Sequence, residues 1–89
     1  MTAKFSNLRE LAEHVSSRAE LASFVRELLN DYRLNREGWE NDSLDHYLEA
    51  IAAWVEDMGG FYKNQGLPTP EKAEWSIFSQ ILLAAKYYE

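Results

Sequence analysis

Cysteine is absent from this 89-residue chain, and proline and glycine are scarce, with two and four residues. Without cysteine, neither disulfide bonds nor thiolate zinc sites can stabilise the fold, which fits a reducing compartment. No apolar run approaches the roughly 18 residues of a membrane span. The N-terminal sequence also lacks the apolar stretch of a signal peptide. We therefore expect a cytoplasmic protein that does not enter a membrane.

Motifs of catalysis and nucleotide binding are missing as well. The sequence has no G-x-S-x-G, no P-loop and no G-x-G-x-x-G pattern. It has no E-x-x-H, which a carboxylate di-metal site in a helical bundle requires. Each histidine follows an acidic residue by four positions, a spacing that allows one hydrogen bond on a helix surface but forms no metal motif. We predict that the protein is not an enzyme and that it binds neither metal nor cofactor.

Basic residues are absent from the middle of the chain. Residues 1–36 carry six basic and five acidic side chains, and residues 63–89 carry three of each. Residues 37–62 carry seven acidic side chains and no basic one, and the net charge is −6. A negative field repels phosphate backbones, so we expect no binding to nucleic acid. The same field attracts basic surfaces, and we predict a basic protein as the partner.

Apolar residues are present at the spacing of helix faces, and no segment alternates with the period of a strand. We expect four helices, at about 7–15, 18–34, 42–58 and 70–88. A hydrophobic content of 46% is high enough for a folded core. The sequence therefore predicts one all-α domain over residues 1–89, with a compact orthogonal or bundle-like packing and no sheet.

Capping residues mark the starts of the first three helices. Ser6 is a candidate N-cap of the first helix. Ser17 and Glu20 have the spacing of a capping box, in which each side chain bonds to the other residue's backbone amide. Asn41 or Asp42 can cap the third helix, whose first turn is acidic and so suits the helix dipole.

A glycine- and proline-containing segment separates the third and fourth helices. Gly59 and Gly60 are predicted to end the third helix, because glycine adopts the left-handed C-cap conformation at little cost. Thr69 and Pro70 are predicted to begin the fourth, since proline loses no hydrogen bond at the first helical position. The fourth helix has two adjacent apolar stripes: Trp75, Phe78, Leu82 and Ala85, and Ile77, Ile81, Ala84 and Tyr88. Such a helix is either central in the fold or shared with a second subunit, so we expect a monomer or a homodimer through the C-terminal helix.

Two groups of residues are candidates for a binding surface. Asp45, Glu49 and Glu56 fall in one line on the outer face of the third helix, which is either a solvated face or a docking strip for a basic partner. Nine of the twelve aromatic residues lie from Trp39 onward. Four of these lie on apolar stripes and are expected in a core between the third and fourth helices: Tyr47, Trp54, Trp75 and Phe78. Four others lie in a loop or near the chain end and are either core or interaction surface: Phe61, Tyr62, Tyr87 and Tyr88.

Two functions follow from these groups. The first is a non-enzymatic interaction protein, inhibitor- or immunity-like, that binds a basic partner through Asp45, Glu49, Glu56, Phe61, Tyr62, Tyr87 and Tyr88. The alternative is a helical domain that binds a small molecule in an aromatic pocket near Trp54 and Trp75. A closed apolar cavity with a few polar groups favours the pocket. A flat aromatic patch rimmed by acidic residues favours the protein partner.

The tryptophan-rich run also carries a resemblance. The sequence W-E-N-D-S-L-D-H-Y-L-E-A-I-A-A-W-V-E-D at 39–57, followed by Tyr62 and by P-E-K-A-E-W at 70–75, resembles a family of small bacterial proteins classed as a domain of unknown function. The likeness spans about Ser17 to Tyr88 and includes S-R-A-E-L-A-S-F-V at its start. It implies a bacterial source and a compact helical fold. It implies no activity, substrate or site residue.

Overall fold

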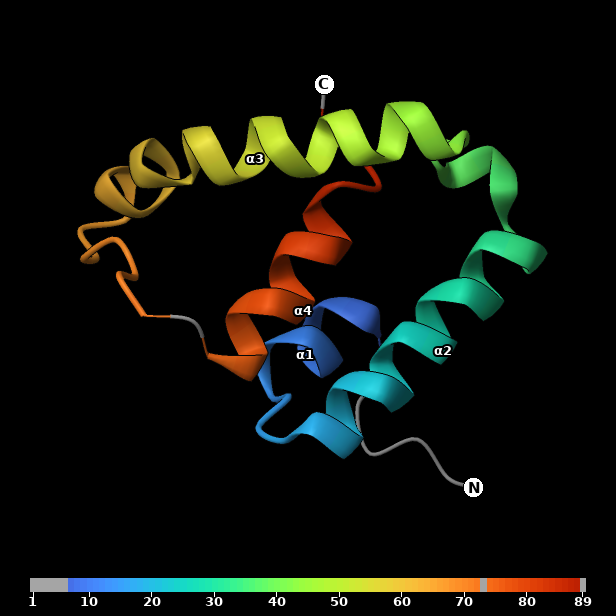
Figure 1. The fold of residues 1–89 in the computed structure, drawn as a ribbon, viewed down its shortest axis with the longest axis horizontal. Coiled ribbons are helices and arrows are strands. Elements are labelled where there is room, and N and C mark those ends of the chain that lie inside the picture. Colours follow the sequence, from blue (N-terminus) through green and yellow to red (C-terminus); the bar gives the residue numbers. More distant parts are fainter. Residues whose placement is uncertain (1–6, 73, 89) are drawn as a thin grey trace.

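The described part of the chain folds into four α-helices and one short 3-10 helix. The computed structural model describes residues 7–72 and 74–88. The elements are α1 (Leu8–Glu13), α2 (Arg18–Leu34), the 3-10 helix η1 (Arg36–Gly38), α3 (Leu44–Asn64) and α4 (Trp75–Ala84). No strand occurs within those described residues. The all-α prediction is therefore confirmed, and Figure 1 shows how the helices are arranged.

Side-chain caps start the first two helices. Asn7 Oδ1 accepts a hydrogen bond from the Glu10 amide at 2.8 Å, so Asn7 is the N-cap of α1. The predicted cap, Ser6, lies outside the described residues. Ser17 Oγ accepts from the Glu20 amide at 3.1 Å, as predicted. The Glu20 carboxylate, however, accepts from the amide and hydroxyl of Ser16 rather than from the Ser17 amide.

The third helix is longer than the sequence predicted. Its N-cap is Ser43, without a side-chain capping bond, and it continues through Gly59 and Gly60 to Asn64. The predicted C-cap at the glycine pair is therefore wrong. After the C-cap Gln65, the chain leaves the helix at Gly66, whose φ of 70° is left-handed. The Gly66 amide donates to Lys63 O and the Leu67 amide to Tyr62 O, which together form a Schellman motif.

The fourth helix is shorter than predicted. It begins at Trp75 after the N-cap Glu74 and ends at Ala84, so the predicted bounds of 70 and 88 are both wrong. Because α3 runs on to Asn64, the chain must return from the far end of that helix to the centre of the fold before α4 can begin (Figure 1). Past Ala84 the backbone forms turns, in which the amides of Tyr87 and Tyr88 both donate to Ala84 O.

Helix α4 lies at the centre of the fold. α1, α2 and α3 each pack against it, and α3 has no other helix as a neighbour among the described residues. One link is fully buried: Ser79 Oγ on α4 donates to the Ala12 carbonyl on α1 at 2.6 Å. The two apolar stripes of α4 predicted a helix that is either central in the fold or shared with a second subunit, and its position matches the first of these.

The core is small and forms mainly where α1, α2 and the segment before α3 meet. Its buried members are Ala12, Val15, Phe24, Leu28 and Trp39, with Tyr32, Tyr47 and Leu82 packed around them. The predicted core positions of Trp75 and Phe78 are wrong, since their exposed fractions are 41% and 44%. α3 meets α4 near the C-terminal end of α4, where the Tyr47 hydroxyl donates a hydrogen bond to the Leu82 carbonyl. The apolar side chains of Trp75 and Phe78, at the start of α4, therefore remain exposed to solvent.

Candidate binding groove

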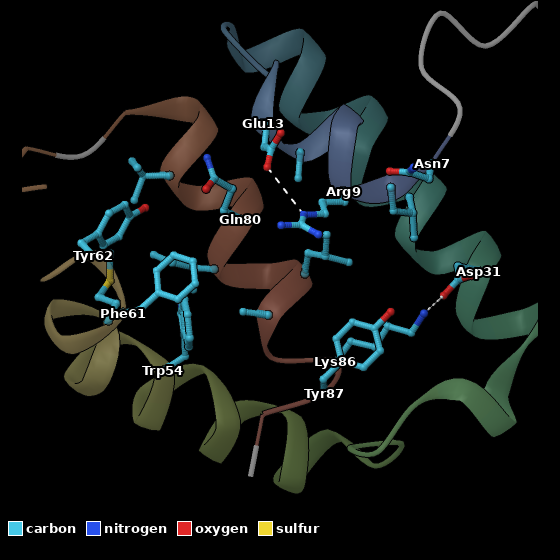
Figure 2. A pocket seen from close by; sticks show the side chains of 17 residues that line it. Asn7, Arg9, Glu13, Asp31, Trp54, Phe61, Tyr62, Gln80, Lys86 and Tyr87 are labelled. Atoms are coloured by element: carbon cyan, nitrogen blue, oxygen red, sulfur yellow. Dashed lines mark hydrogen bonds and ion pairs between the residues drawn. The ribbon is translucent and has the colours of Figure 1, made fainter. Parts of the chain in front are cut away.

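An open groove of about 800 Å³ lies between α1, α4 and the C-terminal half of α3. We call it the aromatic groove, because three side chains of α3 line it with their rings: Trp54, Phe61 and Tyr62. Figure 2 shows these rings pointing from α3 toward α4. The same groove extends past Tyr87 to the paired side chains of Lys86 and Asp31.

The rings on α3 form a chain of edge-to-face contacts. Trp54 and Phe61 are two helical turns apart and therefore face the same way, with ring centroids 5.1 Å apart. Phe61 contacts Tyr62 at 5.3 Å, and Tyr88 contacts the other side of Trp54 at 5.3 Å. Edge-to-face pairs at these distances are favourable beyond the area that they bury. The cluster is thus held in place while much of its surface stays open to solvent.

The floor of the groove comes from one predicted stripe of α4. Ile77, Ile81 and Ala84 recur at three- and four-residue spacing and all line the groove. Met58 of α3 is buried beside them. Tyr88, the fourth member predicted for this stripe, lies beyond the end of α4 and packs on Trp54 instead.

One end of the groove holds a partly buried ion pair. Lys86 Nζ donates to Asp31 Oδ2 at 2.7 Å, and Trp39 Nε1 donates to the same oxygen at 2.8 Å. Burial favours a raised pKa for Asp31, but the hydrogen bonds from Lys86 and Trp39 and the Lys86 charge hold that pKa below its ordinary value. Burial likewise favours a lowered pKa for Lys86, and its bond to Asp31 helps raise that pKa instead. Both groups are therefore charged at neutral pH.

Two tyrosines of the cluster have raised pKa values. Partial burial raises the pKa of Tyr62. The Tyr88 hydroxyl donates to the Asp57 carboxylate, and this hydrogen bond, followed by burial and the Asp57 charge, raises the pKa of Tyr88. Both phenols are therefore neutral hydrogen-bond donors at physiological pH. Asp57 is thereby held at the edge of the groove.

Polar contacts from the start of α3 fix the end of α4. The Asn41 side-chain amide donates to the carbonyls of Ala85 and Tyr88 at 2.9 and 2.6 Å. Tyr47 Oη donates to the Leu82 carbonyl at 2.7 Å, in the last turn, where carbonyls run short of helical partners. Sequence reasoning treated Asn41 only as a possible helix cap and missed this role. Its partners are backbone atoms more than 40 residues away, which leave no local signal.

The predicted site residues fall on two separate surfaces. Phe61, Tyr62 and Tyr87 line the aromatic groove, and Tyr88 adjoins it. Asp45, Glu49 and Glu56 are all exposed. At about 100° per residue they lie roughly opposite Trp54 and Phe61 around α3. The structure does not bring the acidic line and the aromatic groups together on one face.

The predicted pocket between two tryptophans is also divided. Trp54 lines the aromatic groove, whereas Trp75 is not among its described lining residues and instead contacts Phe78, with ring centroids 6.3 Å apart. Among residues 7–72 and 74–88, no group of three or more His, Asp or Glu side chains is placed to hold a metal ion. In the same part of the chain, no helix is both long and apolar enough to cross a bilayer. The aromatic groove offers a binding partner its aromatic rings, its apolar floor and a few charged side chains.

Comparison with known proteins places the sequence in one family. Residues 17–89 match the model of a family described as "Family of unknown function (DUF7660)". No curated protein and no solved structure matches the chain. The match begins at Ser17, the N-cap of α2, and so leaves α1 outside. The predicted resemblance to a family of unknown function is confirmed, and the bacterial source that it implied stays a prediction.

Proposed function

Because the chain belongs to this family of unknown function, whose description names no ligand, we propose a function from its own surface: a non-enzymatic interaction protein. In this proposal the aromatic groove receives a short segment of a protein partner that carries a large apolar side chain flanked by basic residues. The observation that supports it is the set of ordered but accessible rings above an apolar floor.

Accessible aromatic rings favour a protein partner. Phe61 is 40% exposed and Tyr87 is 55% exposed, so a partner can cover ring surface that the fold leaves in water. Tyrosine and tryptophan are enriched among the residues that dominate interface energies, because they bury much area with little loss of rotamer freedom. The Asp31 carboxylate, whose side chain is 24% exposed, can accept a hydrogen bond at one end of a bound segment.

Charge at the groove edge favours a basic segment. Asp57 is held beside Trp54 by Tyr88, and Glu56 precedes it on the exposed surface of α3. The net charge of −6 adds a long-range attraction for basic partners. The outer line of Asp45, Glu49 and Glu56 contributes to that attraction without touching the bound segment. In an inhibitor- or immunity-like role, this long-range electrostatic attraction would speed the association of the protein with its basic partner.

A small-molecule ligand is the second candidate. The groove volume of about 800 Å³ lies within the range of drug-sized sites, and its lining is mainly apolar with a few polar groups. Its openness argues for the protein segment, because ligand pockets usually enclose most of the ligand surface. Screening by thermal shift with a library of aromatic compounds tests this candidate directly.

The proposed function is tested by selecting peptides from a random phage-displayed library on the immobilised protein. We expect enriched peptides to place an aromatic or aliphatic residue beside Lys or Arg, and their binding to weaken as salt rises. Phe61→Ala and Tyr87→Ala should each weaken a selected peptide by about tenfold or more. Leu34→Ala is the matched control, because Leu34 is 79% exposed and lies outside the groove. Peptides without basic residues, or peptides that bind the Phe61 variant as tightly as the parent, would reject the proposal.

A further inference from the structure

A second groove of about 390 Å³ lies between α2 and the start of α3. Leu82 of α4 and Tyr32 of α2 are among its lining residues, and its walls include Val25 and Leu29 of α2 and Leu44 of α3. These three wall residues are 43%, 44% and 73% exposed. The second groove is thus a largely apolar surface, with α2 as one wall and the start of α3 as the other.

Apolar side chains continue from this groove along two helices. Leu48 and Val55 follow Leu44 by four and eleven residues, on the same side of α3, and are 54% and 46% exposed. Phe78 lies one turn before Leu82 on α4 and is 44% exposed. We call the six exposed residues the open apolar face: Val25, Leu29, Leu44, Leu48, Val55 and Phe78. Large apolar side chains exposed beside an apolar groove are typical of an interaction site.

The two walls carry charges of opposite sign at their outer edges. On α2, Arg26 and Arg33 lie about 40–60° beyond Leu29, on the side away from the core. On α3, the line of Asp45, Glu49 and Glu56 lies about 60–100° beyond Leu48, also away from the core. All five are exposed. The ion pairs of the described residues, Arg9–Glu13 and Lys86–Asp31, include none of them.

From this arrangement we infer that the open apolar face is covered by a second copy of the chain, related by a two-fold axis through the second groove. Such an axis places α2 of each protomer over α3 of the other. The arginines on α2 then face the acidic line of the partner's α3, and the reverse contact forms at the symmetric position. An isologous interface needs a surface that is complementary to itself, and apolar walls with opposite charged edges satisfy that condition.

Other occupants match only half of this surface. A basic helix would meet the acidic edge of α3 but would also meet Arg26 and Arg33 on α2. An acidic helix would be attracted by the arginines of α2 but repelled by the acidic edge of α3. A second copy carries both the arginines of α2 and the acidic line of α3. Each of these groups meets the opposite charge on the facing wall, so the charged contacts across the groove are attractive. The dimer uses a face distinct from the aromatic groove, and both aromatic grooves stay available to other partners.

Sedimentation velocity over a series of protein concentrations tests the dimer. We expect the parent to show a monomer–dimer equilibrium that weakens as salt rises. Arg26→Glu with Arg33→Glu, and separately Glu49→Lys with Glu56→Lys, should each raise the dissociation constant by about tenfold or more, since each double change reverses contacts at two symmetric positions. Leu44→Glu should have a similar effect, because Leu44 would be buried in the dimer. Leu34→Ala, outside both grooves, should leave the constant unchanged.

Mixing the two charge-reversed variants is the decisive measurement. In the mixed dimer the new glutamates face the new lysines, and the native arginines of one protomer face the native acids of the other. We expect a heterodimer at least as tight as the parent, with unchanged circular dichroism for each variant alone. A parent that stays monomeric at every concentration overturns the inference. So does a dimer that is insensitive to both the charge reversals and Leu44→Glu. Neither result bears on peptide binding by the aromatic groove, which depends on Phe61 and Tyr87.

Discussion

Lys86 places its ammonium nitrogen 2.7 Å from the Asp31 carboxylate, although 55 residues separate them in the chain. The Lys86 side chain is only 6% exposed, whereas that of Asp31 is 24% exposed. The rings of Trp39 and Tyr87 lie 5.6 and 5.0 Å from the same ammonium group, within the range of cation–π attraction. The pair therefore joins α2 to the segment after α4, in surroundings that leave the ammonium little access to water.

Asp31→Asn should destabilise the protein by about 2 kcal/mol. The substitution keeps the shape but leaves a largely buried ammonium without its counter-charge, and hydrogen bonds to charged groups contribute about 1.5–3 kcal/mol. Urea unfolding followed by circular dichroism measures the change. The control is Glu13→Gln in the exposed Arg9–Glu13 pair, where the two side chains are 84% and 49% exposed, and we expect a change below about 0.5 kcal/mol there. Equal effects of the two substitutions would contradict the importance of the Asp31 pair.

Asp31 should also make the protein sensitive to acid. Its pKa in the folded state is below the ordinary 3.8, so the unfolded chain takes up the proton first as pH falls. The stabilising contribution is complete well above pH 3.8 and is lost as pH falls toward and through the folded pKa. Between about pH 5 and about pH 2 the parent should lose more stability than Asp31→Asn. Parallel stability curves for the two proteins across that interval would contradict this assignment.

Tyr47→Phe should cost about 1 kcal/mol at neutral pH, because it removes the hydrogen bond to the Leu82 carbonyl. Burial raises the pKa of Tyr47 to about 12 from the ordinary 10.0. A raised pKa means that the folded state holds the proton more tightly, so this contribution is present below pH 10 and is lost as pH rises toward 12. The parent should therefore lose more stability than Tyr47→Phe over that interval, measured by urea unfolding at several alkaline pH values. Tyr62 and Tyr88 titrate in both proteins and cancel in the comparison.

Two glycines should respond in opposite ways to alanine. Gly60 lies inside α3, and apart from its chain neighbours and the backbone of its own helix no atom lies within 4 Å of an added Cβ, so Gly60→Ala should stabilise by about 0.5–1 kcal/mol. Gly66 has a φ of 70°, so Gly66→Ala should destabilise by roughly 1–2 kcal/mol. Thermal unfolding of both variants measures the difference. If Gly60→Ala were the more harmful change, α3 would end at the glycine pair and not at Asn64.

These two glycines also show what the sequence could predict of the fold. Apolar periodicity predicted the existence of all four helices, and local capping patterns predicted the start of α2. The end of α3 was misjudged because two helical glycines cost only about 1 kcal/mol each, which packing of the following turn can offset. Gly66, followed by Leu67 and Pro68, carried the correct signal, since an apolar residue after the left-handed glycine and a proline soon afterwards are typical of a helix end.

The candidate site was predictable in part. Phe61, Tyr62 and Tyr87 were identified from their aromatic character, and the structure places all three in one groove. Their separation from the acidic line follows from the 100° step of α3, but which side of that helix faces α4 depends on long-range packing. The exposure of Trp75 and Phe78 depends on where α3 crosses α4, which no local pattern encodes. The contacts of Asn41 and Lys86 join distant segments and required the structure.

The hydrogen bond between Ser79 and Ala12 spans 67 residues and has a consequence for folding. Among the described residues, α3 packs on no helix except α4, and α1 and α2 also pack against α4. A chain emerging from the ribosome therefore exposes three amphipathic helices before the helix that they surround has been made. Closing so long a loop is entropically unfavourable and slows folding. The Ser79–Ala12 hydrogen bond and the packing of α3 can form only after α4 is synthesised, and until then α2 and α3 expose apolar side chains that chaperones bind.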